Sequence, residues 1–211
     1  MFNLPRNTEI GRIIPKNAFE SYCNSKQKKS FVENLKRIVW QNKLSLDTIN
    51  LTGDEVQEIQ IFTIELKKKI EIKDLLTVID KAIPYHIIFK ILFEEEYYLS
   101  ASVKHSNPQN ENMAVIDYTF SSNWKSASDP PFTLELRNNL DWVYRNFCLQ
   151  FTNEKDSSKQ ITELVKNLKD EDALQKEITK LKAAISRSKQ FNKKVELNLK
   201  LRELILRARD C

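Results

Sequence analysis

Apolar residues recur at helical or strand spacing along most of the chain, and this pattern predicts its elements in order. A short helix is predicted over residues 16–24. A second helix is predicted over residues 31–41, because apolar residues recur there every three or four positions. Ser30 and Glu33 have the spacing of a capping box, so this helix is expected to begin with Ser30 as its N-cap.

The middle of the chain contains several runs that are typical of strands. Residues 46–51 and 56–67 flank the turn residues Gly53 and Asp54, and this arrangement predicts a hairpin. Residues 73–83 have helical spacing, and the following proline ends that helix. Three further strands are predicted over residues 86–92, 97–104 and 113–120.

The pattern becomes wholly helical after residue 124. Residues 126–131, rich in Ser, Asp and Pro, are typical of a linker, and a helix is predicted over 133–150 beyond them. Helical spacing continues through residues 161–168, breaks at 170–172, and resumes at 174–185. The apolar residues of the last stretch follow the 4-3-4 spacing of a coiled-coil seam: Leu174, Ile178, Leu181 and Ile185.

This C-terminal seam is shorter than three heptads, so a coiled coil and a packed helix hairpin both fit it. The final segment, from Val195 onward, alternates like a strand over residues 195–201 but is rich in Lys, Glu, Leu and Arg, and we assign it to a helix. The predicted fold is therefore α+β. A mixed sheet of about five strands with covering helices is expected in residues 1–125, followed by an antiparallel or coiled-coil-like helical module in residues 132–211.

Composition narrows the class of protein. The chain has 211 residues, of which 41% are hydrophobic and 30% charged, as in globular proteins. No apolar run approaches the ~18–20 residues that a transmembrane helix needs. The two histidines and three cysteines do not cluster, which excludes a structural zinc site, and two glycines exclude a glycine-rich phosphate loop. The widely spaced cysteines and the lack of a signal-like N-terminus indicate the cytoplasm.

The positive charge is concentrated near the C-terminus. The net charge is +5, and residues 155–211 alone carry +6. Basic residues of this kind contact phosphates or an acidic protein surface, although lysines also simply keep an exposed helix solvated. The residues predicted to bind nucleic acid or a protein partner are Lys180, Lys182, Arg187, Lys189, Lys193, Lys194, Arg202 and Arg207.

A nuclease is the alternative from a different class. Restriction-type nucleases place an acidic residue near one strand and an acid-x-lysine pair on the next, and the carboxylates hold a divalent cation. Glu65 and Lys67 have this spacing, with Asp54 before them and Glu33 on the preceding helix. In this alternative they would form a catalytic Mg²⁺ site. Short motifs of charged residues also arise by chance, so the main interpretation includes no catalytic residue and no metal or other cofactor.

Several longer stretches resemble a known family. They include Phe2-Asn3-Leu4-Pro5, residues 31–51, residues 58–62, and the run from Ile79 to Phe89, which contains Ile83-Pro84-Tyr85-His86. Gln190-Phe191-Asn192-Lys193 near the C-terminus belongs to the same set. In these stretches the sequence resembles a bacterial and archaeal family catalogued as domain of unknown function 4391.

The resemblance implies a setting rather than an activity. Members of this family look like neighbours of helicase-like ATPases and DNA methyltransferases in restriction-type or anti-phage loci. It therefore implies a non-enzymatic accessory subunit of a DNA-defence complex, docking to such an ATPase or methyltransferase and contacting DNA through its basic helices. No catalytic residue is carried over from the family.

One junction between a helix and a strand, within the run from Ile79 to Phe89, has two interpretations. Asp80, Lys81, Tyr85 and His86 lie where a predicted helix ends and a buried strand begins. Ordinary helix termination and core packing explain them, and we favour this interpretation. The alternative is a partner-docking corner made by these four side chains.

Overall fold

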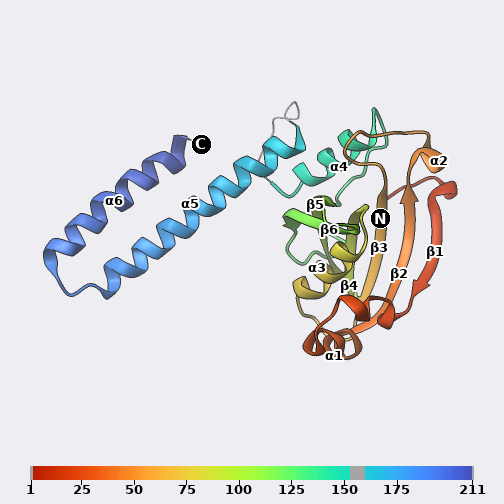
Figure 1. Ribbon diagram of the computed structural model, residues 1–211, viewed down its shortest axis with the longest axis horizontal. Coiled ribbons are helices and arrows are strands. Elements are labelled where there is room, and N and C mark those ends of the chain that lie inside the picture. The colour runs from red at the N-terminus through yellow and green to blue at the C-terminus, as the bar shows by residue number, and fades with distance from the viewer. Residues whose placement is uncertain (1, 153–159, 211) are drawn as a thin grey trace. The chain divides into compact units, whose positions relative to one another are not determined.

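The computed structural model describes residues 2–152 and 160–210. Its central feature is a six-stranded mixed sheet whose strands lie side by side in chain order (Figure 1). The strands are β1 (Glu9–Ile14), β2 (Leu35–Leu44), β3 (Ile59–Leu66), β4 (His86–Phe93), β5 (Glu96–Asn107) and β6 (Asn110–Ser121). The predicted α+β class with a mixed sheet is confirmed.

The sheet is mixed because one of its five strand pairs is parallel. β3 and β4 pair in parallel, because α3 (Lys73–Ala82) returns the chain from the end of one strand to the start of the next. The other neighbouring strands pair antiparallel. The helix predicted over residues 73–83 and the strands predicted over 86–92, 97–104 and 113–120 are confirmed as α3, β4, β5 and β6.

One face of the sheet forms the main hydrophobic core. The 3-10 helix η2 (Lys16–Tyr22), α1 (Ser25–Asn34) and α3 pack against this face. Its fully buried side chains include Phe31 of α1, Phe62 of β3, Ile79 of α3 and Phe89 of β4. The short helix predicted over residues 16–24 is thus present, with 3-10 geometry.

The helix predicted over residues 31–41 is present only as far as Asn34, where α1 ends, and its remainder is wrong. Residues 35–44 form β2, which pairs with β1 on one side and β3 on the other. The helix before it is capped at Asn24, not at Ser30: the Asn24 side chain accepts a hydrogen bond from the Gln27 amide at 2.9 Å. Pairing with two strands satisfies the backbone of β2 on both edges, which overrides the helical spacing of its apolar residues.

The hairpin predicted around Gly53 is also wrong. The first predicted strand is instead the short helix α2 (Leu46–Ile49), which ends at Asn50 in a left-handed conformation with φ 54°. The second predicted strand, over residues 56–67, is confirmed as β3, but its antiparallel partner is β2. β1 was not predicted, because it is an edge strand whose residues are almost all exposed and lack apolar alternation.

A second layer covers the opposite face of the sheet. α4 (Leu140–Leu149) packs there, with the ring of Tyr144 edge-on to His86 at 4.6 Å between centroids. This helix is shorter than the predicted 133–150 because it is capped at Asn139, whose side chain accepts a hydrogen bond from the Trp142 amide at 2.8 Å.

Asp141, in the first turn of α4, fixes the loop between α2 and β3. Its carboxylate accepts hydrogen bonds from the backbone amides of Asp54 and Val56, each at 2.7 Å, and of Glu55 at 3.0 Å. Gly53 permits this close approach: a Cβ there would lie 2.4 Å from the carbonyl oxygen of Val56. The loop and the start of α4 therefore form one tightly joined unit.

The contacts divide the chain into two compact units, Met1–Ser158 and Lys159–Cys211. The expected boundary at residues 126–131 lies inside the first unit, because α4 packs on the sheet. The second unit contains α5 (Ile161–Arg187) and α6 (Phe191–Asp210), which pack against each other as a helix hairpin (Figure 1). The predicted C-terminal helical module, including its last helix, is confirmed.

The apolar spacing breaks at residues 170–172, yet α5 runs through them without interruption. The apolar residues change face there instead. Ile161 and Ile178 are both buried, but they are 17 residues apart, which places them ~100° from each other around the helix axis. The polar triplet thus marks the point where one apolar stripe ends and the next begins.

Candidate functional site

The predicted basic residues gather where α5 meets α6. Residues 180–194 comprise the end of α5, the turn and the start of α6, and contain six basic residues and no acidic one. We call this segment the basic tip. Its cations are Lys180, Lys182, Arg187, Lys189, Lys193 and Lys194.

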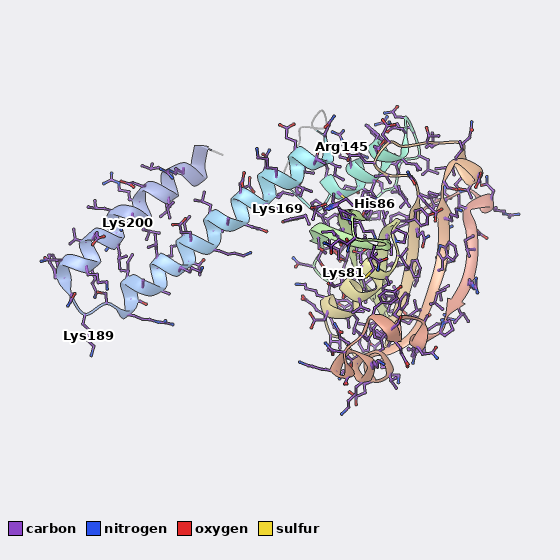
Figure 2. All side chains as sticks on the ribbon, in the orientation of Figure 1. Lys81, His86, Arg145, Lys169, Lys189 and Lys200 are labelled. Carbon is purple, nitrogen blue, oxygen red and sulfur yellow. The ribbon has the colours of Figure 1, made fainter. Side chains whose placement is uncertain are left out.

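The cations of the basic tip face solvent. Five of the six are exposed, and Lys194 is partly exposed. Within the described residues, none of the six lies within ion-pair distance of a carboxylate. Figure 2 shows Lys189 at the turn, with its side chain projecting away from both helices. Close positive charges that form no ion pairs repel one another, so a polyanion would be favoured here.

The other two predicted basic residues lie outside the basic tip. Arg202 and Arg207 are farther along α6, about two and about three and a half turns beyond Lys194. They share this part of the helix with acidic neighbours, and Lys200 there forms an ion pair with Glu196 at 2.9 Å. The predicted set is therefore one compact cluster with two outlying arginines.

An apolar stripe also runs along the exposed side of α6. Phe191, Val195, Leu199 and Leu206 are 79%, 44%, 60% and 52% exposed. On the other side of the same helix, Leu204 is buried, in the packing between α5 and α6. The hairpin thus presents both charge and apolar area to solvent.

The partner-docking corner does not form a single surface. Asp80 and His86 are 1% and 6% exposed, whereas Lys81 and Tyr85 face solvent. A partner could contact the second pair only. For Asp80 and His86 the favoured interpretation, helix termination and core packing, agrees with their burial.

Asp80 is held by Lys104, a buried lysine of β5. The Lys104 ammonium donates to Asp80 Oδ1 at 2.7 Å, and to the backbone carbonyls of Asp80 and Ile83 at 2.8 Å each. All three ammonium protons are therefore used at the C-terminal end of α3. Burial raises the pKa of Asp80 and lowers the pKa of Lys104, while the attraction between the two opposes both shifts. This pair fastens a helix to the sheet.

His86 is a neutral core residue. Burial, together with the nearby charge of Lys104, lowers the pKa of His86 to about 3, and Asp141 only partly opposes this effect. The hydroxyl of Tyr144, the ring partner of His86, donates to the Ser102 carbonyl at 2.8 Å. His86 therefore carries no charge at neutral pH and has little access to a ligand.

A pocket of about 260 Å³ lies between α3 and strands β5 and β6. Its lining includes five hydroxyl side chains, Thr77, Ser100, Ser102, Thr119 and Ser121. Ser102 and Thr119 bond to each other at 3.0 Å, and Ser100 donates to the Phe120 carbonyl at 3.0 Å. Most of these groups are thus engaged within the sheet.

The four residues of the nuclease alternative do not come together. Lys67 donates to the Val32 carbonyl at 2.8 Å, so Glu33, Glu65 and Lys67 share one end of β3. Asp54 precedes the other end of this eight-residue strand, roughly 25 Å away along it.

Two of the three carboxylates of the nuclease alternative are also engaged elsewhere. Arg37 holds Glu65 in an ion pair and lowers the pKa of its carboxyl, and Lys36 adds to this effect. Glu33 pairs with Lys29 at 3.7 Å. In the described parts of the chain, no three His, Cys, Asp or Glu side chains are placed to hold a metal ion.

The family model described as "Domain of unknown function (DUF4391)" matches residues 2–206 of the chain. The chain belongs to this family. Comparison with curated proteins and with solved structures gave no match. Across the residues that the structure describes, no helix has both the length and the apolar character needed to span a membrane. The family match covers the sheet and nearly all of the helix hairpin.

Proposed function

We propose that this chain is a non-enzymatic accessory subunit of a cytoplasmic DNA-defence complex, and that the α5–α6 hairpin is its binding element. The basic tip carries this proposal, because it gathers six solvent-facing cations without a single carboxylate. Such a segment supplies the charge for phosphate contacts.

The partner in this proposal is a helicase-like ATPase or a DNA methyltransferase. The exposed apolar stripe of α6 supports protein docking next to DNA contact, since aromatic and aliphatic anchors contribute most of the affinity of protein interfaces. The nuclease alternative has no such support, because Asp54 lies at the opposite end of β3 from the other three residues.

DNA contact is tested by titrating the full chain against labelled DNA in 50 mM and 200 mM salt. If all six cations contact phosphates, affinity should fall by about 1,000-fold between the two conditions. An affinity that does not depend on salt would contradict phosphate contact. The DNA should also stay intact when Mg²⁺ is present. If the DNA is instead cleaved, and if Glu65→Ala and Lys67→Ala abolish this cleavage, the nuclease alternative is favoured.

Partner docking is tested separately by co-expression with a helicase-like ATPase or a methyltransferase encoded beside this gene. We expect co-elution as one complex in size-exclusion chromatography, and its loss when Leu199→Asp and Leu206→Asp are combined. Lys68→Ala, at an exposed position of the first unit (Met1–Ser158), is the control that should leave the complex intact. Separate elution of the wild-type chain from both partners would contradict the proposal.

A further inference from the structure

Phe191 is an exposed aromatic ring within the basic tip. It is the first residue of α6, and its side chain is 79% exposed, more than any other exposed large hydrophobic residue in the described parts of the chain. Lys189 precedes it by two residues, and Lys193 and Lys194 follow within one helical turn. The ring therefore has cations close to it on both sides in sequence.

We propose that the basic tip binds single-stranded nucleic acid, with Phe191 stacking on a base while the neighbouring cations contact the phosphates. Proteins that bind single strands combine a positively charged surface with aromatic rings on which bases stack. This inference rests on the proposed function, since it specifies which kind of nucleic acid the tip contacts.

The exposed ring favours a single strand over a duplex. In a duplex the faces of the bases are covered by their neighbours in the stack, so a ring such as Phe191 finds no free partner without unstacking a step. In a single strand the base faces are open, and stacking on an aromatic side chain is favourable for every base.

The charges of the tip favour nucleic acid over an acidic protein. Five of the six cations are lysines, and lysine is depleted in the buried parts of protein interfaces. Phosphate contacts, in contrast, are commonly made by flexible, solvent-facing lysines and arginines.

The test measures fluorescence anisotropy of the full chain with labelled single-stranded DNA, single-stranded RNA and duplex DNA of one sequence. We expect the single strands to bind more tightly, and the DNA and RNA arms show which of them the tip prefers. Phe191→Ala should weaken single-strand binding by at least about 5-fold and leave duplex binding unchanged, while Phe191→Trp should retain it. Tyr22→Ala, which removes an exposed aromatic residue of the first unit, is the control and should have no effect.

A charge series separates the phosphate contacts from general electrostatics. Replacing Arg187, Lys189 and Lys193 together by Gln should reduce the slope of log affinity against log salt for single strands by about 2. The matched control replaces Arg12, Lys26 and Lys68, which are also one arginine and two lysines, are exposed and lie on the sheet unit. It removes the same charge and should leave the slope unchanged.

The outcomes distinguish this inference from the proposed function. Equal binding of single strands and duplex, with no effect of Phe191→Ala, would overturn single-strand recognition and leave DNA contact standing. Failure to bind any of the three nucleic acids at 50 mM salt would overturn both. Poly-glutamate that displaces the single strand as well as unlabelled oligonucleotide does would also overturn the inference, in favour of an acidic protein partner.

Discussion

At the scale of single residues, Lys104 is expected to contribute strongly to stability. This residue is 4% exposed. Among the described residues, it supplies the only cation that lies against the buried Asp80 carboxylate. Lys104→Met should lower the free energy of unfolding by about 3–5 kcal/mol, because it leaves a buried charge without its partner. Urea denaturation measures this change.

The control for this variant is Lys90→Met on the neighbouring strand. Lys90 is half-buried, and its ammonium lies 5.5 Å from the centre of the Tyr97 ring rather than against a carboxylate. We expect its loss to cost less than about 1 kcal/mol. Adding Asp80→Asn to Lys104→Met should recover part of the stability, and equal stability of Lys104→Met and Lys90→Met would show that the buried pair contributes nothing.

His86 makes stability depend on pH. Its pKa in the folded protein is about 3, below the ordinary value near 6.5, so the unfolded chain takes up a proton first as the solution is acidified. The contribution of His86 to stability is complete above about pH 6.5 and is lost as the pH falls toward 3. Between pH 7 and pH 5 the loss should be about 2 kcal/mol.

Urea midpoints at the two pH values, for wild type and His86→Phe, measure the contribution of this residue. The variant keeps an aromatic ring against Tyr144 but cannot titrate. Its stability should therefore fall less than that of the wild type between pH 7 and pH 5. The same loss in both proteins would assign the pH dependence to other groups.

At the scale of elements, the contact between Asp141 and the 54–56 loop joins the sheet to α4. Asp141→Ala removes the acceptor of three backbone hydrogen bonds and should destabilise the protein by about 1.5–3 kcal/mol. Asp54→Ala, within the same loop, removes an exposed carboxylate and should change stability by less than about 0.5 kcal/mol. Thermal unfolding followed by circular dichroism compares the two, and a loss of the same size in both would contradict the proposed role of Asp141.

The elements that the sequence predicts correctly are those whose apolar pattern fits only one type of secondary structure. α3 combines helical spacing with a proline stop, and β4 is too short and too apolar to form an amphipathic helix. The stretch around Ile38 has helical spacing, yet its place between two strands decides the outcome, and that is a long-range effect. The triplet at 170–172 is misleading because a change of buried face looks like the end of a helix.

The same distinction applies to the candidate sites. The basic tip is visible in sequence because its six cations are neighbours along the chain. The Asp80–Lys104 pair is not visible, because its members are 24 residues apart on different elements and each one resembles an ordinary surface charge. A lysine at an inward position of an apolar strand is the one sequence feature that points to such a pair.

At the scale of the whole molecule, the two units differ in how many apolar side chains they bury. Strands β3 and β4 lie in the middle of the sheet and contain many fully buried side chains, among them Ile59, Ile64 and Ile88. In the seam between α5 and α6, Ile178 and Leu204 are the buried residues among those whose side chains are described. Local stability follows buried apolar contacts, so the hairpin should open more easily than the sheet.

Amide hydrogen exchange measures this difference directly. We expect α6 to exchange far faster than β3 and β4, and Leu204→Ala to increase the exchange rates of α6 by at least about 30-fold, since truncating a buried leucine costs about 2 kcal/mol or more. Leu199→Ala, on the exposed side of the same helix, should leave these rates unchanged. Because the sheet does not depend on this seam, β3 and β4 should keep their protection in both variants. If instead Leu204→Ala accelerated exchange in α6 and in the sheet equally, the two units would unfold together, and the hairpin could not act as a separate binding element.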